Sequence, residues 1–312
     1  MIGLALGSGS ARGLAHFGVI KALKENDIHI GCVSGSSIGA IVGAAFAGNN
    51  HLGLEKAYRA MDKRSVRSLM DLVLPRSGFM EGERAVKFIS EYYGNDSFQA
   101  LKMPFVAIAT DILTGKEVIL KEGSLTQAVR ASSAVPGLLT PVKWGEWVLA
   151  DGGMVNPVPV SCVRALGAQK VIAVNLNHHF FSHPKKDKTP KAKLFGKKRS
   201  IKNKDKSNEN SSSLDWLSKL SQPFSKLDYP ALINFNKWVK EEPLPGILDV
   251  LMASVDIMET QITENRLAID KPDLLIQPNL SHIRFLDFHK ANEIINEGYL
   301  ATCQALEESK QF

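Results

Sequence analysis

Residues 35–39 read Gly35-Ser36-Ser37-Ile38-Gly39, which matches the pattern G-x-S-x-G. An apolar run typical of a buried strand, Ile28–Val33, precedes them, and Ile38–Ala47 has the composition of a packed helix. In such a strand-to-helix turn the central serine stands clear of the sheet, and the helix N-terminus favours developing negative charge. The flanking glycines remove Cβ atoms that would clash in the tight backbone. The pattern predicts Ser37 as a nucleophile; the alternative is a serine that only caps a helix.

A second glycine-rich turn lies near the N-terminus, where residues 7–13 read Gly7-Ser8-Gly9-Ser10-Ala11-Arg12-Gly13. It joins a predicted strand, Ile2–Leu6, to a predicted helix, Leu14–Lys24, so its backbone N–H groups are placed to hold an anion. Dinucleotide binding is the rival interpretation. The spacing G-x-G-x-x-x-G argues against it, and so does Asp27, which precedes the second strand instead of following it.

The candidate base is an aspartate at the sequence Asp151-Gly152-Gly153, directly after a predicted strand, Trp147–Ala150. A carboxylate at a strand end lies where α/β sheets place their sites, although Asp-Gly-Gly alone is also typical of a plain turn. No histidine is suggested as the base by its position, because His16 falls in the first helix and His178 and His179 begin a different segment.

The order of elements predicts an α/β fold, a three-layer α/β/α sandwich with a mostly parallel central sheet. Further strands are predicted at Phe105–Thr110, Glu117–Leu120, Val171–Asn175 and Leu274–Gln277, and helices at Ile247–Leu267 and Asp287–Glu308. We expect residues 1–177 and 246–312 to form one catalytic domain, with residues 178–245 as an insert.

Composition limits the classes of protein that remain. A chain of 312 residues with 44% apolar and 22% charged residues is not disordered as a whole. Its three cysteines, Cys32, Cys162 and Cys303, are too scattered for a disulfide framework or a metal clip, which favours a reducing cytoplasm. The N-terminus lacks the charged region of a signal peptide, and the uncharged stretch Ile30–Asn50 is too rich in Gly, Ala and Ser to predict a membrane span.

The insert carries the basic charge of the chain. Lys185–Lys206 contains eleven Lys or Arg and two Asp, a net charge of +9, so the rest of a chain with net charge +6 carries −3. Asn203–Ser213 is polar enough to predict disorder, and Leu214–Val239 mixes aromatic residues with lysines. Such a basic run contacts anionic lipid, nucleic acid or only solvent. The aromatic residues that follow it favour an anionic membrane surface over nucleic acid, and for a cytoplasmic protein this is the inner surface of the membrane.

Taken together, the three chemical motifs resemble those of the patatin-like phospholipases. The resemblance continues through Arg130-Ala131-Ser132-Ser133-Ala134-Val135-Pro136-Gly137, covers about residues 2–176 and resumes at residues 247–306. Within that family the chain looks closest to bacterial RssA-type proteins, at Gly3–Gly9 and at Leu286-Asp287-Phe288-His289.

The resemblance implies a serine acyl hydrolase of the phospholipase A or lysophospholipase type, acting on a lipid ester without metal or cofactor. It implies a dyad of Ser37 and Asp151, and an oxyanion-binding turn at Gly9, Ser10, Ala11 and Arg12, with serines at two positions where the family has glycine. The motif glycines are Gly7, Gly13, Gly35, Gly39, Gly152 and Gly153. For Arg12, the sequence leaves open a local ion pair or a lipid phosphate as partner. The alternative function is a weakly active or non-catalytic adaptor of the same fold that acts through its basic insert.

Overall fold

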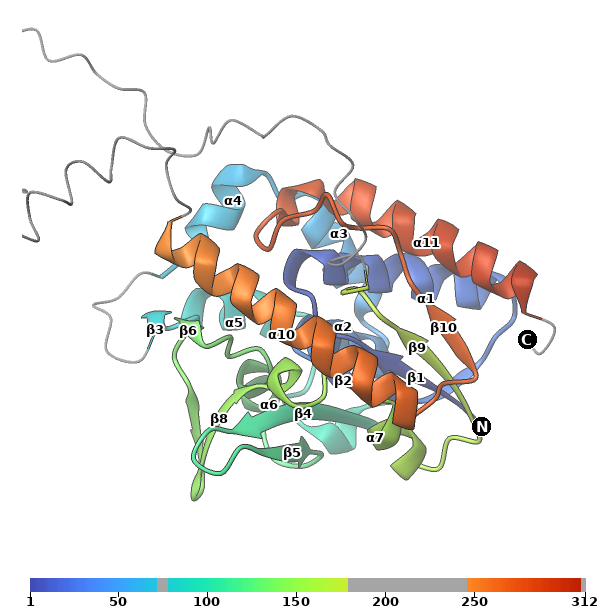
Figure 1. The fold of residues 1–312 in the computed structure, drawn as a ribbon, viewed down its shortest axis with the longest axis horizontal. Coiled ribbons are helices and arrows are strands. Elements are labelled where there is room, and N and C mark those ends of the chain that lie inside the picture. The colour runs from blue at the N-terminus through green and yellow to red at the C-terminus, as the bar shows by residue number, and fades with distance from the viewer. Residues whose placement is uncertain (72–77, 179–245, 310–312) are drawn as a thin grey trace, which may run out of the picture. The chain divides into compact units, whose positions relative to one another are not determined.

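The computed structural model describes residues 1–71, 78–178 and 246–309. Every element below belongs to one structural unit, formed by Met1–Ser182 and Ile247–Phe312 (Figure 1). The strands are β1 (Ile2–Leu6), β2 (Ile30–Ser36), β3 (Gly78–Met80), β4 (Phe105–Asp111), β5 (Lys116–Leu120), β6 (Gly137–Leu139), β7 (Val142–Trp144), β8 (Trp147–Asp151), β9 (Lys170–Val174) and β10 (Leu274–Ile276). The α-helices are α1 (Ala15–Glu25), α2 (Ile38–Ala47), α3 (His51–Arg59), α4 (Lys63–Ser68), α5 (Glu83–Ser90), α6 (Leu125–Ser132), α7 (Val160–Ala165), α10 (Ile247–Ile269) and α11 (Ala291–Glu308). Short 3-10 helices are η1 (Ser10–Leu14), η2 (Phe98–Ala100), η3 (Gly152–Met154) and η4 (Phe288–Lys290).

The central sheet has the strand order β10-β9-β1-β2-β4-β8-β7, and β5 also pairs with β4. The five strands from β10 to β4 run parallel, whereas β5, β7 and β8 are antiparallel to their neighbours. A separate pair, β3 with β6, lies outside this sheet. The prediction of a mostly parallel sheet between helices is confirmed.

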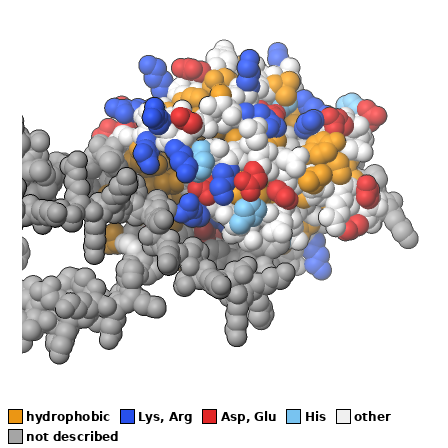
Figure 2. All heavy atoms as spheres, turned by 90° about the horizontal axis from the view of Figure 1, so that it is seen from above, with side chains coloured by type: hydrophobic (Ala, Val, Ile, Leu, Met, Phe, Trp, Pro, Cys, Tyr) orange, Lys and Arg blue, Asp and Glu red, His pale blue; other side chains and the backbone are white. Residues whose placement is uncertain are grey.

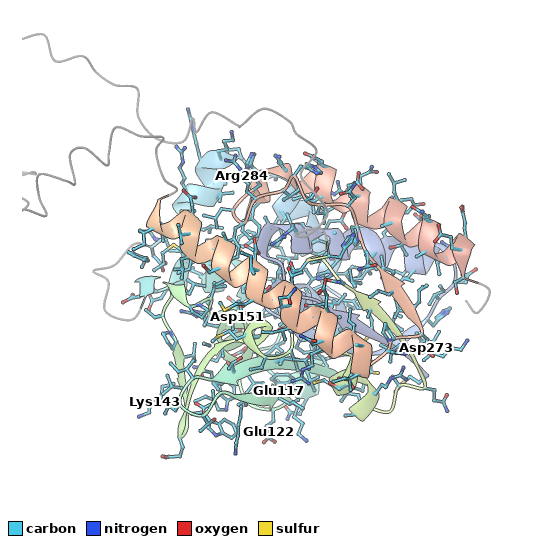
Figure 3. The ribbon with its side chains drawn as sticks, in the orientation of Figure 1. Glu117, Glu122, Lys143, Asp151, Asp273 and Arg284 are labelled. Atoms are coloured by element: carbon cyan, nitrogen blue, oxygen red, sulfur yellow. The ribbon has the colours of Figure 1, made fainter. Side chains whose placement is uncertain are left out.

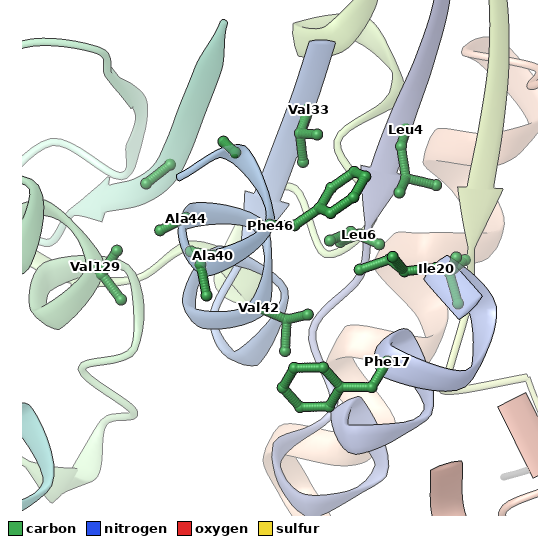
Figure 4. Packing of buried hydrophobic residues seen from close by; sticks show 14 of the residues in the cluster. Leu4, Leu6, Phe17, Ile20, Val33, Ala40, Val42, Ala44, Phe46 and Val129 are labelled. Atoms are coloured by element: carbon green, nitrogen blue, oxygen red, sulfur yellow. The ribbon is translucent and has the colours of Figure 1, made fainter. Parts of the chain in front are cut away.

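Both faces of the sheet are covered, which explains why its central strands are apolar throughout. On one face, Leu4 and Leu6 of β1 pack against α1 and α2, through side chains such as Phe17 and Phe46 (Figure 4). On the other face, Ala5 of β1 packs with Val163 of α7 and with further buried residues of β9. Successive side chains of β1 therefore point into two hydrophobic cores, one on each side of the sheet.

Helices α1 and α11 lie side by side on the first face (Figure 1). A methyl group on Gly18 would come within 1.9 Å of the Ile295 carbonyl oxygen, and one on Gly298 within 2.1 Å of the Ala15 carbonyl oxygen. Glycine at both positions therefore permits a close approach that any larger residue would prevent.

The strand before the serine turn differs from the prediction. It was expected at Ile28–Val33, but β2 begins at Ile30 and continues to Ser36. The start is later because Ile28 N–H still donates to Leu23 O of the preceding helix. The end is later because Gly35 pairs with Leu6 of β1 and Ala107 of β4, so ladders on both sides outweigh the low strand propensity of Ser and Gly. The other predicted strands and helices lie within a few residues of observed elements.

No helix in the described ranges has both the length and the apolarity needed to cross a bilayer. On the face seen in Figure 2, Lys and Arg side chains lie interspersed with Asp and Glu. The basic run Lys185–Lys206, and with it the predicted disorder and membrane contact of the insert, lies outside the described residues. The predicted division of the chain at residues 178 and 245 stays a prediction.

Candidate active site

Ser37 occupies the single residue between β2 and α2, with a backbone of φ 57° and ψ −123°. This conformation is strained for a residue with a Cβ atom, and such strain is typical of functional sites. Its N–H donates to Ser132 Oγ at 3.0 Å, which anchors the turn to α6. The side chain makes no capping hydrogen bond to α2, so the helix-cap interpretation of Ser37 is wrong.

The glycines of the motifs lie where neighbouring backbone or side-chain atoms leave no room for a Cβ atom. A methyl group on Gly39 would be 2.1 Å from Leu6 O, and one on Gly35 would be 2.3 Å from Gly39 O, so the turn is pressed against β1. The remaining motif glycines have similarly close neighbours: Gly7 (2.5 Å from Val174 O), Gly13 (2.1 Å from Ile38 Cγ2), Gly152 (2.2 Å from Ile108 O) and Gly153 (2.3 Å from Glu259 Oε1).

Ser37 and Asp151 meet directly. Ser37 Oγ donates to Asp151 Oδ2 at 2.6 Å, and Gly153 N–H donates to Asp151 Oδ1 at 2.7 Å. Both residues are buried, and Asp151 lies beneath α10 in the view of Figure 3. The backbone at Asp151 is also held, because Thr110 Oγ1 donates to its carbonyl at 2.7 Å. Each carboxylate oxygen therefore has one donor, and the geometry suits transfer of the Ser37 proton to Oδ2.

The strand that carries Asp151 does not run parallel to its neighbour in the sheet, and the sequence did not indicate its direction. β8 is antiparallel to β4, with Asp151 opposite Ala109, and β2 reaches Ile108 on the other side of β4 through Ser36. Asp151 is thus at a strand end, and it pairs with Ala109, the residue of β4 directly after the Ile108 that pairs with the last residue of β2. This arrangement, and not a shared edge of parallel strands, brings the aspartate to Ser37.

Burial raises the pKa of Asp151 from its ordinary 3.8 to about 6, because a charged carboxylate is poorly solvated in the interior. The hydrogen bonds from Ser37 and Gly153 oppose this rise, since they favour the charged form. At neutral pH Asp151 is ionised and is a stronger base than an ordinary aspartate.

The glycine-rich turn presents two open donors. Among the described residues, the N–H groups of Gly9 and Ser10 have no hydrogen-bond partner, whereas Ala11 N–H donates to Phe285 O and Arg12 N–H donates to Gly9 O. Gly9 and Ser10 both have positive φ, at 150° and 48°. The strained Ser10 is held by a hydrogen bond from its Oγ to Phe285 O at 2.6 Å. Of the four residues predicted to bind an oxyanion, only Gly9 and Ser10 have N–H groups left to do so.

Arg12 has a protein partner. Its guanidinium forms an ion pair with Asp256 of α10, and Nε donates to Gly9 O at 3.4 Å. Because this side chain is buried, it ties the glycine-rich turn to α10. Of the two partners left open for Arg12, the structure contains the ion pair.

An apolar cavity opens beside the dyad, and both Ser10 and Ser37 line it. Its walls are mainly aliphatic and aromatic side chains from α2, α4, α5, β6 and the segment before η4: Ile38, Ile41, Val66, Leu69, Val86, Phe88, Leu139 and Leu286. Arg130 also reaches the cavity; its Nη2 donates to Glu81 O and to Thr140 O, which links α6 to the β3–β6 pair. The cavity suits an apolar group attached to whatever reacts at Ser37.

The partners of Ser37 Oγ and of the Asp151 carboxylate, within the described residues, include no histidine. His16 is buried in α1, its Nε2 donates to Gly7 O at 2.8 Å, and burial lowers its pKa to about 4. No group of three or more His, Cys, Asp or Glu side chains is arranged to hold a metal ion in the part of the chain that is described.

Three residues of the site were not found from the sequence: Glu259, Asn177 and the Ser132 acceptor. Glu259 Oε2 accepts from Ser8 Oγ at 2.8 Å and from Asn177 Nδ2 at 3.1 Å. Glu259 lies in a long helical pattern, where a glutamate by itself indicates a surface residue, so no local signal identifies it. Ser132 lies in the stretch Arg130–Gly137 that carried the family resemblance, and this was the only available signal.

Comparison with known proteins gives a consistent result. Residues 4–162 match the sequence profile of the family described as patatin-like phospholipase. An uncharacterized NTE family protein of Mycobacterium bovis is 30% identical over 329 residues, which cover 98% of this chain and 91% of that protein. The neuropathy target esterase sws of Drosophila melanogaster is 35% identical over 182 residues, 56% of this chain and 13% of that protein. VipD from Legionella pneumophila has a TM-score of 0.41 and 12% identity, over 98% of this chain and 66% of that chain. The finer likeness to RssA-type proteins stays a prediction.

Proposed function

Because this chain belongs to the patatin-like phospholipase family, whose members are lipid hydrolases, we propose that it is a serine acyl hydrolase that cleaves lipid esters. The observation that carries the proposal is the 2.6 Å hydrogen bond from Ser37 Oγ to Asp151 Oδ2, made beside an apolar cavity. A hydroxyl paired with a buried base at a strand-to-helix turn is an activated nucleophile. An acyl chain in the cavity brings its carbonyl carbon to that hydroxyl.

In the first step Ser37 Oγ attacks the ester carbonyl carbon, and its proton passes to Asp151 Oδ2. The raised pKa of Asp151 helps here, since a base is most effective when its pKa lies close to the working pH. When the tetrahedral intermediate collapses, the bond to the alcohol oxygen breaks and Asp151 returns the proton to that oxygen. The alcohol leaves, and Ser37 is left as an acyl ester.

The oxyanion of the intermediate is held by the N–H groups of Gly9 and Ser10. Two open donors on one turn match what such an intermediate needs, and one donor of this kind is typically worth about 3 kcal/mol. Phe285 O, which accepts from Ser10 Oγ and from Ala11 N–H, keeps the turn in position. Water then attacks the acyl ester, Asp151 takes its proton, and the same donors stabilise the second oxyanion. When this intermediate collapses, the bond from the acyl carbon to Ser37 Oγ breaks, Asp151 returns the proton to Oγ, and the carboxylic acid leaves.

The substrate follows from the cavity and the family together. Walls of aliphatic and aromatic side chains favour binding of an acyl chain, because they remove its apolar surface from water. Among the described residues that line the cavity, the charged ones are Asp71 and Arg130. Phospholipids and lysophospholipids are therefore the proposed substrates, and the steps above use no metal or cofactor. We also infer that Lys185–Lys206 brings the enzyme to anionic membrane surfaces, the inner surface in a cytoplasmic setting.

The test is to treat the purified chain with a fluorophosphonate probe and a panel of phospholipids, lysophospholipids, glycerides and short esters. We expect labelling and ester cleavage that are lost in Ser37→Ala, while Ser34→Ala and Ser36→Ala retain both. The adaptor interpretation expects weak labelling and cleavage by the wild type, or none. Labelling that persists in Ser37→Ala would show that another residue is the nucleophile.

A further inference from the structure

Glu259 of α10 is a buried acid that the reaction steps above do not use. Only 7% of its surface is exposed, and its Oε2 accepts hydrogen bonds from Ser8 Oγ at 2.8 Å and from Asn177 Nδ2 at 3.1 Å. Ser8 is the residue directly before the open donors of the glycine-rich turn, and Asn177 follows the end of β9. One carboxyl group therefore connects α10 to the turn that holds the oxyanion.

Glu259 also approaches the base of the dyad. A methyl group built on Gly153 would be 2.3 Å from Glu259 Oε1 and 3.1 Å from Asp151 Oδ1, so both carboxyl groups reach the same point. Gly153 is required there because no side chain fits between them. Two carboxylates this close in a buried site do not both ionise readily.

The charged groups that face Glu259 come from three elements. Asp151 lies on β8, Arg12 on η1, and Asp256 one turn earlier on α10. Burial and the neighbouring Asp151 raise the pKa of Glu259 to about 8, while Ser8 and Arg12 act in the opposite direction. Since Arg12 and Asp256 are paired with each other, the uncompensated charge beside Glu259 is that of Asp151. Burial and the repulsion between Asp151 and Glu259 therefore disfavour ionisation of both carboxyl groups at once.

We propose that Glu259 is a positioning residue of the hydrolase site, which as a neutral acid holds the oxyanion turn through Ser8 and which on ionising strengthens Asp151 as a base. The first part follows from the hydrogen bonds, and the second from the closeness of the two carboxyl groups. A negative charge next to Asp151 favours transfer of the Ser37 proton to it, and the effect is reciprocal between the two groups. The inference rests on the proposed function, because it acts through Asp151 and Ser37.

The decisive variant is Glu259→Gln, measured as kcat and KM against pH with a soluble ester. The amide oxygen still accepts from Ser8 and Asn177, so the variant keeps the hydrogen bonds that hold the turn and loses only the group that can ionise. The wild type should show a rise through pH 6 and a second, severalfold rise near pH 8, whereas Glu259→Gln should show only the first. Glu264→Gln, an exposed position on the same helix, is the control and should keep both rises.

Two further measurements separate this role from simple packing. Glu259→Leu removes the acceptor of Ser8 and Asn177 and should lower kcat at pH 7 with little change in KM. Thermal stability gives a readout that needs no activity. The pKa of Glu259 is raised from 4.5 to about 8 in the folded state, so the folded protein loses stability as the pH rises between those two values. The melting temperature of Glu259→Gln should therefore exceed that of the wild type by a margin that grows from pH 5 to pH 8.

An active wild type whose pH profile is the same as that of Glu259→Gln, or falls near pH 8, overturns this inference and leaves the proposed function intact. A melting-temperature difference that stays constant with pH also overturns it. A wild type without labelling or hydrolysis overturns both proposals together.

Discussion

Asp151→Asn should remove activity and at the same time stabilise the protein. The carboxamide keeps the local hydrogen bonds, since Nδ2 can donate to Ser37 Oγ and Oδ1 can still accept from Gly153 N–H. The base is lost, so kcat should fall by about 10²–10⁴-fold with little change in KM. The gain in stability follows from burial, which raises the pKa of Asp151 from 3.8 to about 6.

Each unit of pKa shift is worth about 1.4 kcal/mol, so the ionised Asp151 costs the native state about 3 kcal/mol above pH 6. Because the pKa of this carboxyl group is raised in the folded state, its ionisation lowers the stability of the protein as the pH rises. Below pH 3.8 the group is protonated in both the folded and the unfolded state and costs nothing, whereas between pH 3.8 and 6 only the unfolded state ionises, and stability falls. The variant should therefore be more stable than the wild type by up to this amount at pH 7, and equal to it in acid.

The assay is urea unfolding of the wild type and Asp151→Asn across this pH range, together with hydrolysis of a soluble ester. Glu122→Gln is the control; Glu122 is exposed and is labelled well below Asp151 in Figure 3. It should change neither property. A variant that keeps more than a tenth of the wild-type kcat, or one that is less stable than the wild type at pH 7, would refute the assignment of Asp151 as a buried base.

Further predictions concern the serine turn, metals and the basic run. Ser132→Ala leaves the buried Ser37 N–H without its acceptor and should lower the free energy of unfolding by about 1–3 kcal/mol, measured by urea unfolding; an unchanged value would contradict the anchoring role. Chelation with EDTA should leave hydrolysis unchanged, because the proposed steps use only side chains and backbone N–H groups; activity restored by a divalent ion after chelation would count against them. Deleting Lys185–Lys206 should spare hydrolysis of a short soluble ester but weaken sedimentation with anionic vesicles, as should high salt, since each lysine near the surface attracts such lipid by about 1 kcal/mol. Equal sedimentation of intact and deleted protein would make the run a solvated linker.

Much of the fold could be predicted from local pattern. The helix after the serine turn was expected at Ile38–Ala47 and α2 has those bounds, because apolar spacing and the glycine turn act within a few residues. Strand positions were also close, since short Val- and Ile-rich runs between turns are local signals. The direction of β8 was not predicted, because a strand carries no mark of whether its neighbour runs parallel or antiparallel to it.

The candidate site residues also divide into those that a local motif indicates and those that only the packing of distant segments brings together. By itself, the sequence identified Ser37 and the glycine-rich turn as candidates from short motifs with their own glycines, and it indicated Asp151 through the order of the three motifs, which resembles that of the family. Only the tertiary structure decided that Ala11 N–H is taken by Phe285 and that Arg12 pairs with Asp256. It also decided the place of Glu259, whose hydrogen-bond partner Ser8 is 251 residues away. Such contacts, and the pKa values that burial shifts, depend on which distant segments pack together, and the spacing of residues along a chain does not record that.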